Sequence, residues 1–243
     1  MSEALPDRGW APGYLTVPTA GEGPGVVVLQ DWWGVDGQVH SVVDRLAAEG
    51  FAAFAPDLYE GRVTTDPDEA ARLARHLEPG DLPRELLEAV EVVRALPGVT
   101  SAPVAVVGLG LGGALALYLA SLEPEVGAVV CYDGLPPPSG PFEWAGVRAA
   151  VLGHACEREF QRAGELQAGL RRSGVAATFY LYPGTLHGFP DATRPACHHR
   201  AAAALSWQRT VRFLSERSTA VPTIGHPTST GSPPPHPEGT SAA

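Results

Sequence analysis

The stretch Val104-Ala105-Val106-Val107-Gly108-Leu109-Gly110-Leu111-Gly112-Gly113 decides the fold of this chain. Its apolar start predicts a buried strand, and a helix-forming run, Ala114-Leu115-Ala116-Leu117-Tyr118, follows the glycines at once. A strand that turns sharply into a helix exposes one residue at the turn, beside backbone N–H groups and a helix N-terminus. We expect position 110 to be that residue.

Two known devices use this strand–turn–helix geometry. The first is the nucleophile elbow of α/β-hydrolases, in which small residues flank a nucleophile; here Gly108 and Gly112 flank position 110. Position 110 is Gly, so the nucleophile position is vacant in that register. The second is the dinucleotide fingerprint G-x-G-x-x-G, matched by Gly108, Gly110 and Gly113, with Asp133 twenty residues further on. Taken alone, the local pattern favours the dinucleotide motif.

Composition limits the classes of function. A chain of 243 residues, 44% hydrophobic and 18% charged, fits one α/β domain with a full core, or two small domains. The net charge of −10 disfavours nucleic acid and anionic membranes as partners, so we expect a small-molecule substrate. All 17 basic residues are Arg, which excludes Schiff-base chemistry by lysine and a phosphate-loop lysine.

Cysteine usage and hydropathy bear on location. Cys131, Cys156 and Cys197 are scattered and odd in number, which suits a reducing compartment. The longest apolar runs fall short of the ~20 residues that span a bilayer, and the N-terminus lacks a signal pattern. We therefore expect a cytoplasmic protein.

Strand and helix patterns alternate along the chain. Turn and cap signals place helices at about 38–49, 66–77, 81–96, 111–121, 157–172 and 196–215, and strands at 14–17, 25–30, 51–55, 104–107, 126–132, 147–152 and 178–182. This order predicts the α/β class: a single, mostly parallel, doubly wound sheet with helices on both faces. We expect an irregular N-terminus over 1–12, one domain over 13–217 and a disordered Pro/Ser/Thr-rich tail over 218–243.

Ligands of such sheets bind at the carboxyl ends of the strands. The residues that follow the predicted strands there are Asp31-Trp32-Trp33, Asp57-Leu58-Tyr59, the Gly110 turn, Asp133, His154 to Glu159, and Gly184 to Phe189. An acidic loop and a His loop come after the elbow, which is the α/β-hydrolase order of nucleophile, acid and histidine.

Four motifs carry a specific resemblance. Gln30-Asp31-Trp32-Trp33-Gly34, Ala55-Pro56-Asp57-Leu58-Tyr59, the glycine elbow and Tyr182-Pro183-Gly184-Thr185-Leu186-His187-Gly188-Phe189 together resemble the dienelactone hydrolase family, over about Gly13 to Leu214. The resemblance implies a single α/β-hydrolase domain that acts on lactones and esters of small organic acids through a Cys-His-Asp triad. In this chain Gly110 stands in the place of the Cys.

The resemblance also suggests roles for other residues. His187 matches the family histidine, and Asp31 falls where the family has a Glu that contacts the nucleophile. The family's Asp has no counterpart in the loop after Gly153, which offers Glu157 or Glu159; we take Glu159 as the acid, although little separates the two.

The remaining candidate residues surround the elbow. The backbone N–H groups of Leu111 and Trp32 are candidate oxyanion donors. Trp33, Tyr59 and Arg62 are candidate pocket residues, with Arg62 suited to a carboxylate. His198-His199 lacks metal-ligand spacing to any other Cys or His, so we expect no metal site, and we expect no cofactor.

We consider three functions for this chain. The first is a non-covalent enzyme, in which His187 moves a proton while backbone donors stabilise an oxyanion or enolate, in hydrolysis by activated water or in isomerisation, cyclisation or elimination of a polyketide-like substrate. The second is a catalytically inactive ligand-binding protein. The third, a dinucleotide-binding Rossmann-type protein, is weakened because the glycines follow about 100 residues that already contain three strands, whereas the fingerprint normally opens its domain.

Overall fold

A computed structural model of the chain describes residues 12–77, 80–100, 103–136 and 146–218. Most of the irregular N-terminus predicted over 1–12, and the tail predicted from 218 except Ser218 itself, lie outside these residues. Ser218 ends the last helix.

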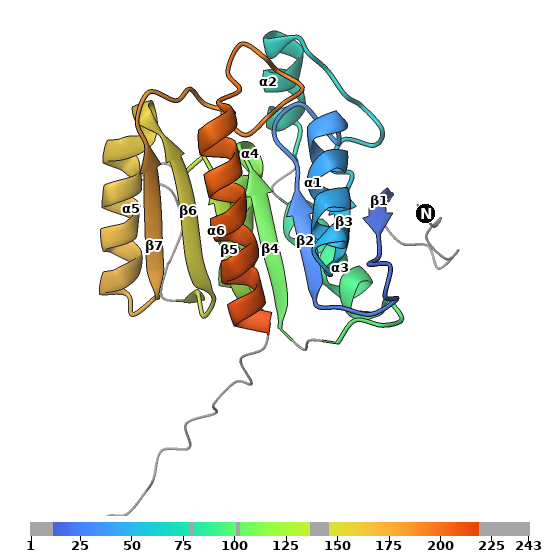
Figure 1. Cartoon of the computed structure of the whole chain (residues 1–243). Helices are drawn as coiled ribbons and strands as arrows, with labels where there is room; N and C mark the ends of the chain where they lie inside the picture. Colours follow the sequence, from blue (N-terminus) through green and yellow to red (C-terminus); the bar gives the residue numbers. More distant parts are fainter. Residues whose placement is uncertain (1–11, 78–79, 101–102, 137–145, 219–243) are drawn as a thin grey trace, which may run out of the picture.

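Seven strands form one sheet in the order β1-β3-β2-β4-β5-β6-β7 (Figure 1). The strands are β1 Gly13–Thr16, β2 Gly25–Leu29, β3 Ala52–Pro56, β4 Val104–Leu109, β5 Val126–Tyr132, β6 Ala150–Cys156 and β7 Ala177–Tyr182. All neighbouring pairs are parallel except β1 with β3, so the carboxyl ends of six strands meet at one edge of the sheet. The predicted α/β sheet is confirmed.

Helices cover both faces of the sheet. They are α1 Gly37–Ala48, α2 Pro67–Arg75, α3 Leu82–Arg94, α4 Leu111–Leu122, α5 Phe160–Arg172 and α6 Arg200–Ser218. One core layer packs α3, α4 and α5 against the sheet, and the other packs α1 and α6 (Figure 1). β4 lies in the middle of the sheet with all six residues buried, which fits its unbroken apolar sequence.

Local signals in the sequence account for the helix starts. Asp36 accepts hydrogen bonds from the backbone N–H groups of Gln38 and Val39, and so caps α1. Asp66 does the same for α2, with Pro67 at the first helical position, which confirms the predicted start. None of the helices in the described ranges combines the length and hydropathy needed to cross a bilayer.

The strand predicted at 147–152 is displaced, since β6 spans Ala150–Cys156. The prediction stopped early because His154 is polar, yet its ring is fully buried. Both ring nitrogens have partners: Nδ1 lies 2.9 Å from the Tyr182 hydroxyl and Nε2 lies 3.0 Å from the Thr210 hydroxyl. A satisfied polar group costs little to bury, so the strand continues through it.

Candidate active site

The glycine stretch forms a sharp turn between β4 and α4. Gly110 has φ +49°, a conformation that residues with a side chain rarely adopt. Its neighbours are equally constrained: a Cβ at Gly108 would run into the Gly112 carbonyl, and one at Gly112 into the Leu29 carbonyl. A Cβ at Gly134 would overlap the carbonyl of Gly110 itself. The turn thus has the backbone form of a nucleophile elbow, with Gly at its apex.

The Asp31 carboxylate occupies the space beside this apex. Its Oδ1 accepts hydrogen bonds from the backbone N–H of Trp32 at 2.7 Å and of Leu111 at 3.0 Å, the two predicted oxyanion donors. A Cβ on Gly110 would overlap the same carboxylate. Asp31 therefore lies where a nucleophilic side chain at position 110 would begin, and its carboxylate oxygen holds both donors.

Asp31 is also unusual electrostatically. Only 8% of its surface is exposed, and burial raises the pKa of its carboxyl. The two backbone hydrogen bonds and the electrostatic interactions with His187 and Arg194 act in the opposite direction on the Asp31 pKa, and burial prevails. A buried carboxylate with a raised pKa beside a histidine is typical of acid–base sites.

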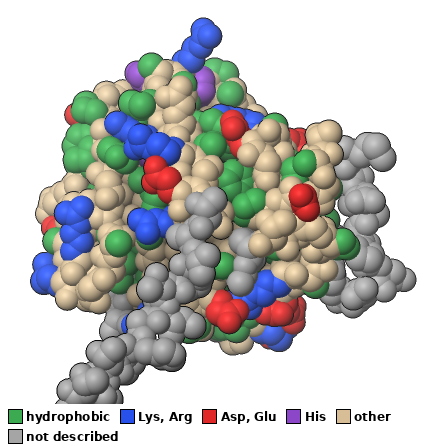
Figure 2. Space-filling view, turned by 60° about the horizontal axis from the view of Figure 1, so that its bottom comes forward, with side chains coloured by type: hydrophobic (Ala, Val, Ile, Leu, Met, Phe, Trp, Pro, Cys, Tyr) green, Lys and Arg blue, Asp and Glu red, His purple; other side chains and the backbone are tan. Residues whose placement is uncertain are grey.

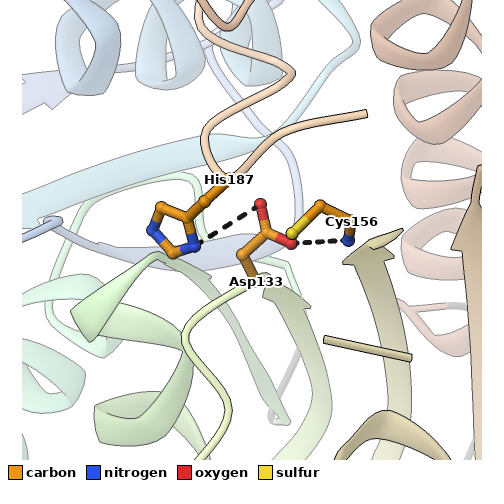
Figure 3. Close-up of side chains that lie close together, drawn as sticks. All are labelled: Asp133, Cys156 and His187. Carbon is orange, nitrogen blue, oxygen red and sulfur yellow. Dashed lines mark hydrogen bonds and ion pairs between the residues drawn. The ribbon is translucent and has the colours of Figure 1, made fainter. Parts of the chain in front are cut away.

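His187 faces Asp133 (Figure 3). His187 Nδ1 lies 3.9 Å from Asp133 Oδ2, which also accepts a hydrogen bond from the Gly188 N–H at 3.0 Å. Asp133 Oδ1 accepts one from the Cys156 N–H at 2.7 Å. Asp133 has φ +54°, a strained value for a residue other than Gly. The carboxylate is fixed by backbone donors in a position to orient the imidazole.

Asp133, not Glu159, is the acid that the structure places beside His187. Glu159 lies in the short 3-10 helix η2, Glu157–Glu159, and pairs with Arg162 at 3.5 Å and Arg158 at 4.0 Å. The prediction took Glu159 because the family resemblance implies an acid a few residues after Gly153, where the sequence offers Glu157 or Glu159. Asp133 carried a usable signal, since it follows a predicted strand at the carboxyl edge, but it was assigned to the dinucleotide pattern.

Cys156 is a neighbour of this pair that the sequence did not indicate. Single ligand-type atoms of Asp133, Cys156 and His187 lie within 4.8 Å of one another, a grouping that a metal ion can use (Figure 3). A metal would need the Cys156 thiolate, whereas burial, together with the negative charge of Asp133, raises the pKa of that thiol to about 12. Both Asp133 oxygens also already accept backbone hydrogen bonds. An acid–base site fits these three residues better than a metal centre.

Two aromatic side chains follow Asp31 in the loop after β2. The rings of Trp32 and Trp33 meet edge to face with centroids 4.9 Å apart, and the Arg194 guanidinium stacks over Trp33 at 3.9 Å. Arg194, which the sequence did not single out, thereby adds a partly buried cation near Asp31. Arg62, by contrast, is exposed and donates to the Tyr59 carbonyl at 3.2 Å, so its guanidinium is engaged away from the elbow.

Several buried polar atoms around the site lack a hydrogen-bond partner. Within the described part of the chain these include Gln30 Nε2, the Tyr59 hydroxyl and His187 Nδ1. Burial, and next the negative charge of Asp31, raises the pKa of Tyr59 to about 12, so Tyr59 is a proton donor. Unsatisfied buried groups are rare, and their grouping near one corner is a mark of a ligand site.

A hollow of about 10 Å³ lies between the two halves of the site, with room for about one water molecule. Its walls are Asp31, Gln38, Leu109, Gly110, Tyr132, Asp133, His187, Gly188 and Pro190. The structure thus brings Asp31, Gly110 and His187 together around the hollow. The predicted acid Glu159 and the predicted pocket residues Trp33, Tyr59 and Arg62 do not line it.

A parallel sheet with an elbow after its central strand, and a histidine and an acid on later loops, defines the α/β-hydrolase fold. Within that fold, the profile of the dienelactone hydrolase family matches residues 11–218, and the chain belongs to that family. The Gly110 turn follows the central strand β4, and Asp133 and His187 follow the later strands β5 and β7.

Individual relatives agree. The protein named Protein usf from Aquifex pyrophilus is 29% identical over 218 residues, covering 85% of this chain and 94% of its own length. Carboxymethylenebutenolidase 1 of Cupriavidus pinatubonensis is 34% identical over 117 residues, covering 44% of this chain and 50% of its own length. The solved structure named m3DLH superposes with a TM-score of 0.77 at 26% identity, covering 85% of this chain and 92% of that one.

Proposed function

We propose that this chain is an enzyme that works without a nucleophile at position 110 and acts on a small lactone, ester or polyketide-like substrate. One observation carries the proposal: the Asp31 carboxylate occupies the space that a nucleophilic side chain would need and holds both oxyanion donors. The rest of a hydrolytic site surrounds it, with His187 and Asp133 on the opposite side of a hollow with room for about one water molecule.

Hydrolysis in this site needs no covalent adduct. An incoming carbonyl oxygen replaces Asp31 Oδ1 on the N–H groups of Leu111 and Trp32, where these donors stabilise the oxyanion. His187 removes a proton from the attacking water as the new C–O bond forms, and returns it to the leaving oxygen as the old bond breaks. Because burial raises its pKa, the Asp31 carboxylate takes up a proton more readily than an exposed carboxylate does, and the protonated acid accepts hydrogen bonds from the N–H donors less strongly.

The same groups serve a reaction without water. If His187 removes a proton next to the bound carbonyl, the two N–H groups stabilise an enolate, and isomerisation, cyclisation or elimination follows. Tyr59 and Asp31 are then candidate proton donors to the rearranged product.

The test is turnover of a panel of small lactones, aryl esters and β-ketone substrates by the full chain. The variant His187→Gln should lose about 10²- to 10⁴-fold in kcat/KM, the usual contribution of a positioned base. The matched control His76→Gln alters an exposed histidine at the end of α2 and should change kcat/KM by less than about twofold. Saturable binding of these compounds without turnover would instead indicate a ligand-binding protein.

A second candidate activity uses Asp31 directly. Both backbone donors bind Oδ1, so neither engages Oδ2. A carboxylate held in this way can attack a saturated carbon: Oδ2 forms a C–O bond as an epoxide C–O or a carbon–halogen bond breaks, giving an Asp31 ester. The donors then lie on the ester carbonyl oxygen, and water activated by His187 attacks the Asp31 carboxyl carbon, releasing the alcohol and restoring the carboxylate.

Oxygen labelling distinguishes the two activities. A single turnover of an epoxide or alkyl halide in H₂¹⁸O, with enzyme in excess, puts the label in the Asp31 peptide if Asp31 is the nucleophile. If water attacks the substrate, the label is found in the product alone, and Asp31 acts only in acid–base catalysis.

A further inference from the structure

A cavity lies at the opposite end of the sheet from the candidate active site. It measures about 390 Å³ and lies between the second half of α6, the end of α5 and the first residues of β6 and β7. Four arginines and one glutamate line it, namely Arg171, Arg209, Arg212, Arg217 and Glu216. Figure 2 faces the end of the molecule at which the strands start, and several Arg side chains lie on one side of it. This positive cavity belongs to a chain with a net charge of −10.

Two of these guanidinium groups are held in place by groups other than carboxylates. Arg209 stacks over the Tyr180 ring at 3.7 Å and donates to the Tyr182 hydroxyl at 3.1 Å. Arg171 donates from Nε to the Ala177 carbonyl at 2.8 Å. Neither forms a carboxylate ion pair within the described ranges. Arg212 meets Glu216 at 3.8 Å across an exposed surface, where such a pair contributes little. Fixed, carboxylate-free guanidinium groups favour an anionic ligand.

The other walls indicate the size and polarity of that ligand. Val151, Leu152, Tyr180 and Phe213 give the cavity an apolar and aromatic side. A volume of 390 Å³ lies in the range of small-molecule sites, which begins at about 300 Å³. A small organic molecule with two negative charges, such as a dicarboxylate or a phosphate monoester, matches both the cluster of arginines and the apolar side.

A buried chain of hydrogen bonds runs from this cavity to the candidate active site. It begins with the bond from Arg209 to Tyr182, and the Tyr182 hydroxyl lies 2.9 Å from His154 Nδ1. His154 Nε2 lies 3.0 Å from Thr210 Oγ1, which in turn lies 2.7 Å from the Tyr132 hydroxyl. Tyr132 lines the hollow beside Gly110, and its carbonyl accepts the Gly110 N–H at 2.9 Å. The hydrogen-bond chain therefore ends on the last residue of β5, directly before Asp133.

The first bond of this chain runs from Arg209 to the Tyr182 oxygen, because a guanidinium only donates. In the His154 tautomer that carries its proton on Nε2, the Tyr182 hydroxyl donates to His154 Nδ1. Burial, aided by the charge of Arg209, lowers the pKa of His154 to about 3, so the ring is neutral and in this tautomer donates from Nε2 to Thr210. Each bond in such a chain polarises the next, so a change at Arg209 alters the whole series.

We propose that the cavity between α6 and strands β6–β7 binds a small organic dianion through Arg171, Arg209 and Arg212, and that its occupancy is transmitted through Tyr182, His154 and Thr210 to the Gly110 corner. An anion that engages Arg209 weakens the donation of this guanidinium to Tyr182, and so changes the hydrogen bond that reaches Tyr132. This site is independent of the proposed reaction, because it lies outside the hollow and uses none of its residues.

Binding is tested with succinate and glycerol 3-phosphate as probes, by calorimetry on the full chain. Saturable binding is expected for at least one probe, and the identity of that probe separates the carboxylate from the phosphate source. Arg209→Gln and Arg212→Gln should each weaken binding about 10- to 100-fold. Arg200→Gln removes the same charge from the first turn of α6, outside the cavity, and should change binding less than about twofold. No saturable binding of either probe, or an equal loss in Arg200→Gln, would overturn the site.

Transmission is tested by the NMR signal of the His187 ring during titration with the bound probe. The signal should shift in the unmodified chain and not in Tyr182→Phe or Thr210→Val, each of which removes one hydroxyl of the hydrogen-bond chain. Thr210→Val should bind the probe with unchanged affinity, because Thr210 does not line the cavity. A His187 signal that shifts equally in both variants would overturn the transmitted effect.

Discussion

The candidate active site has two halves, the His187–Asp133 pair and the turn at Gly110, and they match the residues implied by the family resemblance to different degrees. On one side, His187 keeps the residue type that the family resemblance implies, and it faces an acid, Asp133, supplied by the loop after β5. On the other side, the elbow keeps its backbone but has Gly at its apex, and Asp31 from the loop after β2 occupies the space next to it. In this chain glycines and backbone N–H groups hold the turn without a side chain at its apex.

The largest effect is expected when the carboxylate beside His187 is replaced. Asp133→Asn keeps the shape of the side chain but removes the charge that orients and stabilises the imidazole, so kcat/KM should fall about 10²- to 10⁴-fold on any substrate of the enzyme. The matched variant Glu159→Gln alters the acid that the sequence suggested and should lose less than about twofold. Steady-state kinetics of the two variants decide between the acids, and a larger loss in Glu159→Gln would reverse the assignment.

The next test alters the turn at Gly110. Gly110→Ala places a Cβ against the Asp31 carboxylate, at a residue with positive φ. We therefore expect the free energy of unfolding, measured by urea denaturation, to fall by about 1–3 kcal/mol. The double variant Gly110→Ala with Asp31→Gly removes the obstructing carboxylate and should recover part of that loss. If both variants are as stable as the original chain, the carboxylate does not occupy the corner.

A smaller effect concerns stability and pH. Because burial raises the folded-state pKa of Asp31 above its unfolded value, the folded chain binds more protons at this site, and its contribution to stability falls as pH rises through the interval between the two values. Asp31→Asn should therefore raise Tm at neutral pH by about 2–4 °C, and the gain should shrink below about pH 4. Thermal melts at pH 7.5 and pH 3.5 check this. A Tm gain that is the same at both pH values would contradict a buried, charged Asp31.

The smallest expected effect is that of metal removal. Because both Asp133 oxygens already accept backbone hydrogen bonds, the Asp133, Cys156 and His187 group should bind no zinc at neutral pH. Dialysis against a chelator, followed by addition of Zn²⁺, should change kcat/KM by less than about twofold. A chelator-dependent loss that zinc restores would show that the group is a metal centre.

Much of the fold, and about half of the site, could be predicted from the sequence. Long apolar runs such as β2 and β4 have an unambiguous period, and the elbow and His187 lie in short local motifs. The acid was missed because its identity depends on tertiary contacts: Asp133 becomes the partner of His187 only when the loops after β5 and β7 meet. The occupation of both oxyanion donors by Asp31 is equally non-local, joining residues 31 and 111.

The contact between Gly134 and the Gly110 carbonyl has a consequence for how this site can change. The loop that carries the acid and the turn that carries the vacant apex touch through bare backbone, with no side chain between them to absorb a shift. A methyl group at position 134 would overlap the Gly110 carbonyl and would push the loop that carries Asp133 away from the turn. We therefore expect new substrate specificities to arise from substitutions of nearby side chains such as Trp33 or Arg194, while the backbone contact between Gly134 and Gly110 stays unchanged.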